Sequence, residues 1–496
     1  DVISGGGDNQ IKSSCTTGGN VVSGGYNNCI IDEKPADSGR LYNNTISGGR
    51  CSSILTTYGN SQMNVIAGGS YNYICENATG NTIIGNNNEF DSRENGDMCY
   101  NISVGAFNDI DTGRLGGGIA HGNILTGSEL TVRAVGYDAY TCYNNISGYN
   151  SSVKTCGGPD VPGKESYALA RHNNISGGYC NYITSISSNT NDSCLQTSNI
   201  GGGYCNYICV ANGGRIYAST IGGGYCNEIV ARDNAELCSN NISGGGANFI
   251  GGAGTCNATI SGGYNNYING DDSNNATISG GYCNYIYGAE SSSATISGGY
   301  YNKIYGGASC NSTIGGGYCN RIYGNYANTN VIGGGSENKL YGNYTASAVI
   351  AGGKSNSING DLSYHTLVGG GYNNSITGNY APRNIIVGGA DNSIDNGNTS
   401  VIGGGRYNAI NGAYHSGIMS GKCNVINGGY ASVQTILGGY NNTNGSYESH
   451  VLGSNITTDR VCTAFVNNLS IKSIPTVVTG LPAGSVWNNA GVLNIV

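Results

Sequence analysis

The sequence predicts an all-β protein, a β-solenoid (β-roll) built from two-strand coils of about 18 residues. Three observations predict this fold class. The motif T-I-S-G-G-Y-x-N-x-I-x-G recurs along most of the chain, its aliphatic positions return at a nearly constant interval, and glycine fills 87 of the 496 positions. A repeat this short cannot bury its own aliphatic side chains, so successive repeats must stack on one another.

The composition excludes several other classes. Collagen needs glycine at every third position, and a hydrophobic content of 38% argues against disorder. The net charge of −8 is thinly spread without a basic run, so the electrostatic footprint of a nucleic-acid-binding protein is missing. No apolar stretch is long enough for a membrane span.

The first aliphatic residue of the repeat forms one predicted core ladder, and the second, eight residues later, forms another. The first ladder contains Ile260, Ile278, Ile296, Ile314, Ile332, Ile350, Val368 and Ile386, each eighteen residues after the last. Looser copies upstream are Ile3, Val22, Ile46, Ile66, Ile83, Ile102, Ile146, Ile175, Ile200, Ile221 and Ile242. The second ladder contains Ile268, Ile286, Ile304, Ile322 and Leu340, and an Asn lies two residues before each. Each buried side chain is expected to contribute roughly 1.5–3 kcal/mol.

The regularity of the repeat predicts three regions. Residues 1–255 are expected to form irregular coils with insertions, and residues 256–455 regular coils of 16–18 residues. Residues 456–496 lack glycine pairs, hold the only tryptophan, Trp487, and are expected to form a small C-terminal β segment. Within that segment we expect a hairpin around Asn488–Gly491.

The residue before the first aliphatic should point out of the coil, yet it is apolar in the later repeats. This row contains Val331, Val349, Leu367, Ile385 and Val401. The residue after the aliphatic is small, as at Ser279 and Gly315, and would let a neighbouring backbone approach. We therefore expect a subunit interface on this face; the alternative is strong β-propensity on a free face. In earlier repeats Thr259, Thr277, Asn174 and Asn199 make the same position more polar.

One family resembles this repeat. Residues Gly263–Gly270 (GYNNYING) resemble the G-x-x-S-x-A-x-G of the YadA-like head repeat of trimeric autotransporter adhesins, and Thr259–Gly262 occupies the place of its S-V-A-I. The resemblance extends over most of residues 1–455, although Asn replaces the turn Ser, Ile replaces the small Ala, and the coils are longer. It implies a homotrimer of β-rolls. Residues 456–496 are similar to the closing segment of viral tail-fibre proteins; the alternative is a simple solenoid cap.

Cysteine and asparagine indicate an oxidising, extracellular setting. Cys180, Cys205 and Cys226 each lie five residues after the first aliphatic in successive coils, which makes them candidates for disulfides. Asn257, Asn275 and Asn311 begin N-x-S/T triplets just before the same repeat position, and Asn174 and Asn241 begin two more. These five are candidate N-glycosylation sites.

No catalytic, cofactor or metal constellation is expected. The five histidines are dispersed, the glycine runs lack the G-K-[ST] of a phosphate-binding loop, and Asp does not recur in each turn as calcium-binding repeats require. The 38 tyrosines favour surface ladders, with sugar binding as the alternative.

Three functional classes follow. The first is a non-enzymatic structural fibre or filament subunit, outside a cell or on a virion surface, whose copies associate laterally or end to end. The array starts in a repeat at Val2–Ile3, so that coil is expected to dock on another subunit unless a preceding segment was removed. The second class is an adhesin head that binds a cell-surface glycan or receptor through insertions such as residues 154–166. The third is ice binding through the row Thr259, Thr277, Thr295 and Thr313.

Overall fold

A computed structural model shows an all-β chain built as a β-solenoid. It describes residues 1–12, 17–32, 39–56, 59–75, 78–86, 88–91, 97–106, 109–112, 119–128, 131–135, 140–156, 168–186, 193–211, 214–231, 236–307, 309–429, 432–470 and 472–496. These residues contain no helix, and so none that could cross a bilayer. Contacts divide the chain into two compact units, Asp1–Ser355 (unit 1) and Asn356–Val496 (unit 2). The regions expected from repeat regularity have other boundaries, at residues 255 and 455.

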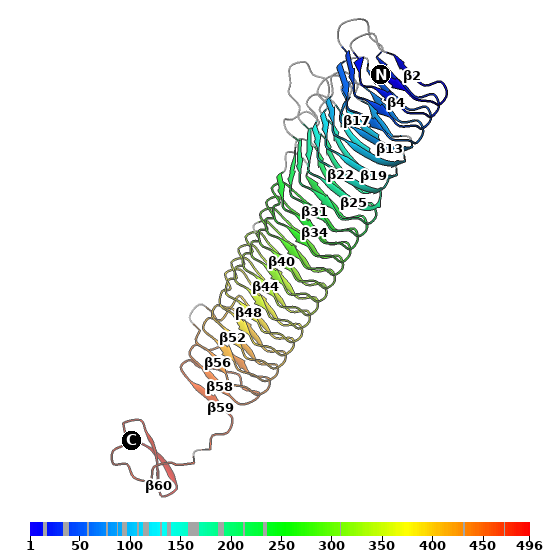
Figure 1. Ribbon diagram of the computed structural model, residues 1–496. Helices are drawn as coiled ribbons and strands as arrows, with labels where there is room; N and C mark the ends of the chain where they lie inside the picture. The colour runs from blue at the N-terminus through cyan, green and yellow to red at the C-terminus, as the bar shows by residue number, and fades with distance from the viewer. Residues whose placement is uncertain are drawn as a thin grey trace, which may run out of the picture. The chain divides into compact units, whose positions relative to one another are not determined.

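Each coil of unit 1 places one strand in a first sheet and one in a second sheet, and the strands of successive coils are parallel (Figure 1). Strands of the first sheet are β1 (Val2–Ile3), β4 (Val21–Val22), β7 (Thr45–Ile46), β10 (Val65–Ile66), β13 (Thr82–Asn86), β16 (Ile102–Ala106), β19 (Ile124–Ser128), β22 (Asn145–Tyr149), β25 (Asn174–Tyr179), β28 (Asn199–Ile200), β31 (Thr220–Ile221), β34 (Asn241–Ile242), β36 (Thr259–Ile260), β38 (Thr277–Ile278), β40 (Thr295–Ile296), β42 (Thr313–Ile314), β44 (Val331–Ile332) and β46 (Val349–Ile350). Strands of the second sheet are β2 (Gln10–Lys12), β5 (Cys29–Asp32), β8 (Ser53–Thr56), β11 (Tyr73–Cys75), β14 (Glu89–Asp91), β17 (Asp109–Thr112), β20 (Thr131–Val135), β23 (Ser152–Cys156), β26 (Tyr182–Ile186), β29 (Tyr207–Ala211), β32 (Glu228–Ala231), β35 (Phe249–Gly251), β37 (Tyr267–Asn269), β39 (Tyr285–Tyr287), β41 (Lys303–Tyr305), β43 (Arg321–Tyr323) and β45 (Lys339–Tyr341).

The larger coils of unit 1 contain a third strand that the two-strand repeat does not predict. The third sheet contains β3 (Thr17–Gly18), β6 (Gly39–Tyr42), β9 (Gly59–Gln62), β12 (Ala78–Thr79), β15 (Asp97–Cys99), β18 (Ile119–His121), β21 (Tyr140–Cys142), β24 (Ala168–Arg171), β27 (Ser193–Gln196), β30 (Arg215–Tyr217) and β33 (Glu236–Cys238). Its interior residues, such as Leu41, Leu195, Ile216 and Leu237, are fully buried. The extra residues of these coils therefore enlarge the core as well as forming insertions.

Unit 2 repeats the two-strand pattern. Its strands with the first aliphatic are β48 (Leu367–Val368), β50 (Ile385–Ile386), β52 (Val401–Ile402), β54 (Gly417–Ile418), β56 (Thr435–Ile436), β58 (His450–Leu452) and β59 (Ala464–Val466). Those with the second are β47 (Ser357–Asn359), β49 (Ser375–Thr377), β51 (Ser393–Asp395), β53 (Ala409–Asn411) and β55 (Val425–Asn427). In β57 (Thr443–Asn444), Asn444 takes the place of the second aliphatic. Strands β60 (Val486–Asn489) and β61 (Val492–Ile495) form an antiparallel hairpin with Ala490 and Gly491 at its turn.

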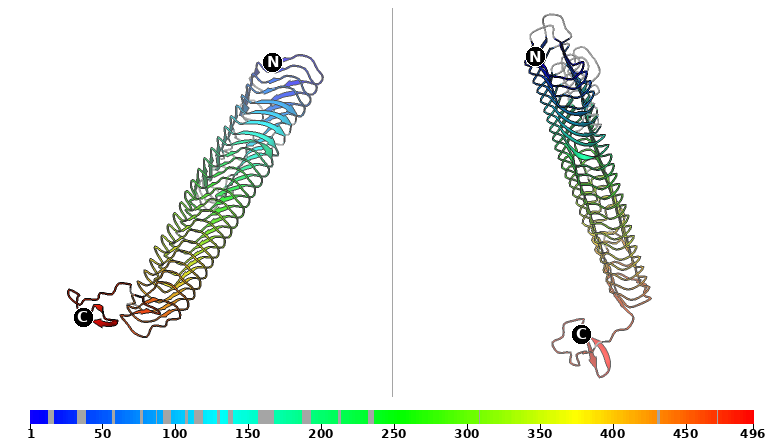
Figure 2. Two further views of the ribbon diagram at one scale, coloured as in Figure 1. Left: turned by 90° about the horizontal axis from the view of Figure 1, so that it is seen from below. Right: turned by 45° about the vertical axis from the view of Figure 1, so that its right-hand side comes forward.

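The aliphatic ladders fill the interior. All ten isoleucines Ile260, Ile268, Ile278, Ile286, Ile296, Ile304, Ile314, Ile322, Ile332 and Ile350 are fully buried. In the first sheet each pairs directly with the next, from Ile260 with Ile278 to Ile332 with Ile350. Figure 2 shows the stacked coils of unit 1 from two further directions. Because each coil presents the same side chain in the same place, each coil is the packing template of the next.

One upstream ladder position was assigned wrongly from the sequence. Ile102 pairs with Ile124 on the outer face and is 39% exposed, whereas Ser103 occupies the interior position and is 1% exposed. The coil that contains Leu125 was missed, and Leu125 is fully buried. In these upstream coils the register follows an Asn two residues before the interior residue, here Asn101 and Asn123, whose side chains hydrogen-bond to each other.

A second interior ladder, made of asparagine, lies beside the isoleucines at the start of the second strand. Asn284 shows its pattern: its side-chain Nδ2 donates to the carbonyl oxygens of Gly280 (2.9 Å) and Gly299 (3.0 Å). Its Oδ1 accepts from the backbone N–H of Asn302 at 3.0 Å. The ladder asparagines from Asn266 to Asn338 are fully buried with these partners. Buried amides are tolerated because every coil supplies the same partners.

Candidate functional site

The interior of each unit is filled by ladders, so function must be sought on the outer faces. Among the described residues, no three His, Cys, Asp or Glu side chains gather closely enough to hold a metal ion. Four outer features follow from the coil geometry. The first is the outward face of the strands that contain the first aliphatic residue of the repeat. The others are the tyrosine row, the corner where cysteines have left-handed backbone, and the asparagines at the turns.

The outward face of the strands with the first aliphatic is most apolar in unit 2. Here Leu367, Ile385 and Val401 are half-buried, and they pair in register along β48, β50 and β52. The residues after the aliphatic are bulky and exposed on the same face: Val387 (56%), Met419 (45%), Leu437 (51%) and Leu452 (52%). Sequence reasoning selected the first row and missed the second, because the second is interrupted by Gly403.

In unit 1 the same face is smaller and more polar. Val331 and Val349 pair directly and are half-buried, and both follow the row Thr259, Thr277, Thr295, Thr313. Asn174 and Asn241 lie in this same row, earlier in the array. A glycan on either asparagine would therefore occupy the face on which the subunit interface was expected.

The tyrosine row follows the glycine pair at a corner of the coil. Tyr179, Tyr204 and Tyr225 stack with ring centroids 5.2–5.3 Å apart and interplanar angles of 4–9°. Tyr264, Tyr282, Tyr300 and Tyr318 stack likewise at 5.1–5.5 Å. Within each of these two runs the ring faces cover one another, so edges and hydroxyls point outward. This geometry favours the surface-ladder interpretation, because a sugar ring would stack on an open ring face.

The cysteine slot next to this row is a corner with left-handed backbone. Cys180, Cys205 and Cys226 have φ values of 49–53°, and the environment of the Cys205 thiol includes both Cys180 and Cys226. All three are free thiols. Cys205 is thus brought next to two candidate partners, while Cys283 has Asn265 and Tyr301 as neighbours.

Sequence reasoning missed another cysteine pair. Cys238 and Cys256 face each other in a parallel bridge, and burial, with the nearby Cys256 thiol, raises the pKa of Cys238 to about 12. They lie eighteen residues apart, so the repeat length itself was the available signal. Both are free thiols in this structure.

The candidate glycosylation sites differ in accessibility. Asn257, Asn275 and Asn311 are exposed at left-handed turn positions with φ of 56–57°. Asn174 and Asn241 are half-buried, and their side chains hydrogen-bond to Ser176 and Ser243. Two other N-x-S triplets begin at Asn101 and Asn444, which are fully buried.

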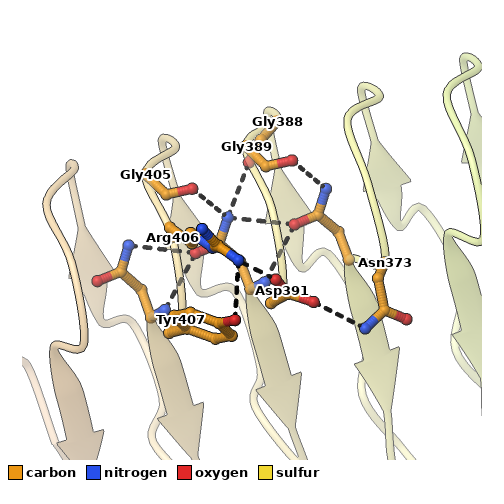
Figure 3. Close-up of polar contacts among 10 residues, drawn as sticks. Asn373, Gly388, Gly389, Asp391, Gly405, Arg406 and Tyr407 are labelled. Carbon is orange, nitrogen blue, oxygen red and sulfur yellow. Dashed lines mark hydrogen bonds and ion pairs between the residues drawn. The ribbon is translucent and has the colours of Figure 1, made fainter.

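A charged cluster lies on the corner of unit 2 (Figure 3). Asn373 Nδ2 donates to Asp391 Oδ1 at 2.9 Å, and Arg406 Nε lies 3.6 Å from Asp391 Oδ2. Arg406 also donates to the Tyr407 hydroxyl at 2.9 Å and lies over its ring. These groups satisfy one another across neighbouring coils, so the cluster ties the corners together.

No family model matches this sequence, and no curated protein matches it either. Function is therefore inferred from the surface geometry. Much of the insertion at residues 154–166, a candidate binding loop, lies outside the described residues.

Proposed function

We propose that the chain is a non-enzymatic structural subunit of a fibre displayed outside a cell or on a virion surface. In this proposal it forms a homotrimer, like the YadA-like heads that its repeat resembles. We place the outward face of the strands with the first aliphatic toward the shared axis. The main observation that supports this proposal is the apolar face of unit 2.

Seven side chains make up the apolar face of unit 2: Leu367, Ile385, Val387, Val401, Met419, Leu437 and Leu452. The methyl group of Met419 lies next to Gly417, so the Met419 side chain fills the space beside this glycine. A contiguous apolar patch of this kind on a protein surface marks a contact with another molecule. A second copy of the same chain offers the matching surface, and cyclic symmetry would close the contact.

The remaining features fit a structural role. Exposed turn asparagines, such as Asn257 and Asn275, leave a separate edge of unit 1 free for glycans. The hairpin β60–β61 is exposed at Val492, Leu493 and Ile495, and a two-stranded hairpin is marginal alone in water. Association of several copies would cover these apolar side chains as well.

Sedimentation velocity on the purified chain tests the proposal. We expect a trimer that the double variant M419K/L437K converts to monomer, because two charges would be buried at the contact. The matched control is Y380K/Y447K, which adds the same charge at two exposed tyrosines outside the apolar face. A monomeric wild-type chain, or the same trimer in both variants, would overturn the proposal.

A further inference from the structure

Three cationic residues form an in-register column on the outer face of the second sheet of unit 1. Lys303 pairs with Arg321, and Arg321 pairs with Lys339, in the adjacent strands β41, β43 and β45. Neighbouring strands lie about 4.8 Å apart, so three positive charges are held in a short row. They are three of only 21 Lys and Arg residues in a chain of net charge −8.

Like charges directly opposite in a sheet are destabilising, and this column is compensated only by neighbouring tyrosines, such as Tyr341, which hydrogen-bonds to Arg321. Among the described residues, none of the three forms an ion pair with an acid. The Nε atom of Arg321 is buried and has no hydrogen-bond partner. Lys303 Nζ lies 4.9 Å from the Tyr285 ring centroid, which partly offsets its charge by a cation–π contact.

A tyrosine column runs beside the cations. Tyr287, Tyr305, Tyr323 and Tyr341 follow in register, two residues after Tyr285, Lys303, Arg321 and Lys339. Tyr305, Tyr323 and Tyr341 stack at 5.1 Å with interplanar angles of 7° and 21°. The stacked ring faces of these tyrosines cover one another. Their ring edges and hydroxyl groups therefore form a row next to the three cations.

We infer that this strip, defined as Lys303, Arg321, Lys339 and the tyrosines Tyr287, Tyr305, Tyr323 and Tyr341, binds an acidic glycan that carries sulfate or carboxylate groups. A negative group would supply the ion-pair partner that the three cations lack. The row of tyrosine hydroxyl groups would hydrogen-bond to sugar hydroxyls. The rise per coil of about 4.8 Å is close to the length of one sugar residue, so successive sugar residues can lie opposite successive cations of the strip.

A nucleic acid fits the strip less well. Single-stranded nucleic acids are held by bases that stack on open aromatic faces, and the stacked faces of Tyr305, Tyr323 and Tyr341 are covered. The inference goes beyond the proposed structural fibre by naming a ligand, and it does not require self-association.

The test measures binding of the full chain to size-defined heparin and hyaluronan oligosaccharides by biolayer interferometry. Neutral dextran and oligothymidylate serve as comparison probes. We expect heparin or hyaluronan to bind and the triple variant K303Q/R321Q/K339Q to bind at least tenfold more weakly. Arg321→Lys, which keeps the charge but removes the planar guanidinium that can bind a carboxylate or sulfate with two hydrogen bonds, should weaken binding about threefold. Circular dichroism melting would show that the variants remain folded.

The matched control is R50Q/K354Q/K472Q, which removes three charges from exposed, separate positions. It should bind like wild type. Equal weakening in both triple variants, tighter binding of oligothymidylate than of either glycan, or no binding of either glycan would overturn the inference. The variant M419K/L437K should keep glycan binding, so this test and the test of self-association can fail separately.

Discussion

Asn284 donates both its backbone N–H and its side-chain Nδ2 to a single atom, Oδ1 of Asn266 in the preceding coil, at 3.0 and 3.1 Å. The same link joins Asn266 to Asn248, so the buried amides form a continuous ladder. This ladder fixes the vertical register of the coils, whereas the isoleucine ladder supplies most of the apolar burial.

Replacing Asn284 by Ala should destabilise the solenoid by roughly 2–4 kcal/mol, because the carbonyls of Gly280 and Gly299 and the N–H of Asn302 lose a buried partner. Chemical denaturation measures this change. Asn359→Ala, at an exposed position, is the control and should be near neutral. Equal stability of the two variants would contradict a structural role for the ladder.

The two glycines of one corner should respond differently to alanine. A Cβ at Gly389 (φ +93°) would collide with the carbonyl oxygen of Gly405, whereas a Cβ at Gly388 meets open space. Gly389→Ala is expected to cost at least about 2 kcal/mol, and Gly388→Ala close to nothing. Thermal melting of both variants checks the order, and the reverse order would refute the corner geometry (Figure 3).

Alkaline pH should weaken unit 1 through Tyr207. Burial is the main cause that raises its pKa from the ordinary 10.0 to about 12. The unfolded chain ionises this phenol near pH 10, whereas the folded chain keeps it neutral. The stabilisation is therefore full below pH 10 and is lost as the pH rises toward 12. Tyr207→Phe should show a shallower fall of unfolding free energy between pH 10 and 12, and unchanged steepness would contradict the assignment.

Cys238 and Cys256 should form an intrachain disulfide under mild oxidation with glutathione disulfide. They face each other in adjacent coils, within the Cα separation that a disulfide needs. Non-reducing peptide mapping should also show Cys205 joined to Cys180 or Cys226. A dominant Cys283–Cys319 peptide would conflict with the stacking order, because Tyr301 lies between these two cysteines.

Glycopeptide mass spectrometry of the chain from a secreting eukaryotic host should find sugar on Asn257, Asn275 or Asn311, which are exposed. Asn101 and Asn444 should be unmodified, because they are fully buried. Glycans on Asn101 would contradict its place in the interior ladder.

The eighteen-residue spacing was sufficient to predict the solenoid and its isoleucine ladders. The third strand was missed because its signal is weak: one buried residue lies five positions before the first aliphatic, as Leu41 does before Ile46. The Ile102 register failed because hydrophobicity selects Ile102 over Ser103 as the interior residue, whereas the position of Asn101 in the asparagine ladder would have selected Ser103.

Surface sites that form only when coils stack were also missed from the sequence. No run of basic residues marks the cationic column in the sequence. Lys303, Arg321 and Lys339 are eighteen residues apart and become neighbours only when the coils stack. Cys238 and Cys256 were hidden for the same reason. Reading the sequence at the repeat period, column by column, would have shown both.

The most direct test of the proposed fibre subunit is a cryo-electron microscopy map of the native protein under non-reducing conditions. We predict three copies with Val387, Met419, Leu437 and Leu452 buried against one another at the shared axis. Single copies with these side chains facing solvent, or an assembly joined through the tyrosine rows, would contradict the proposal.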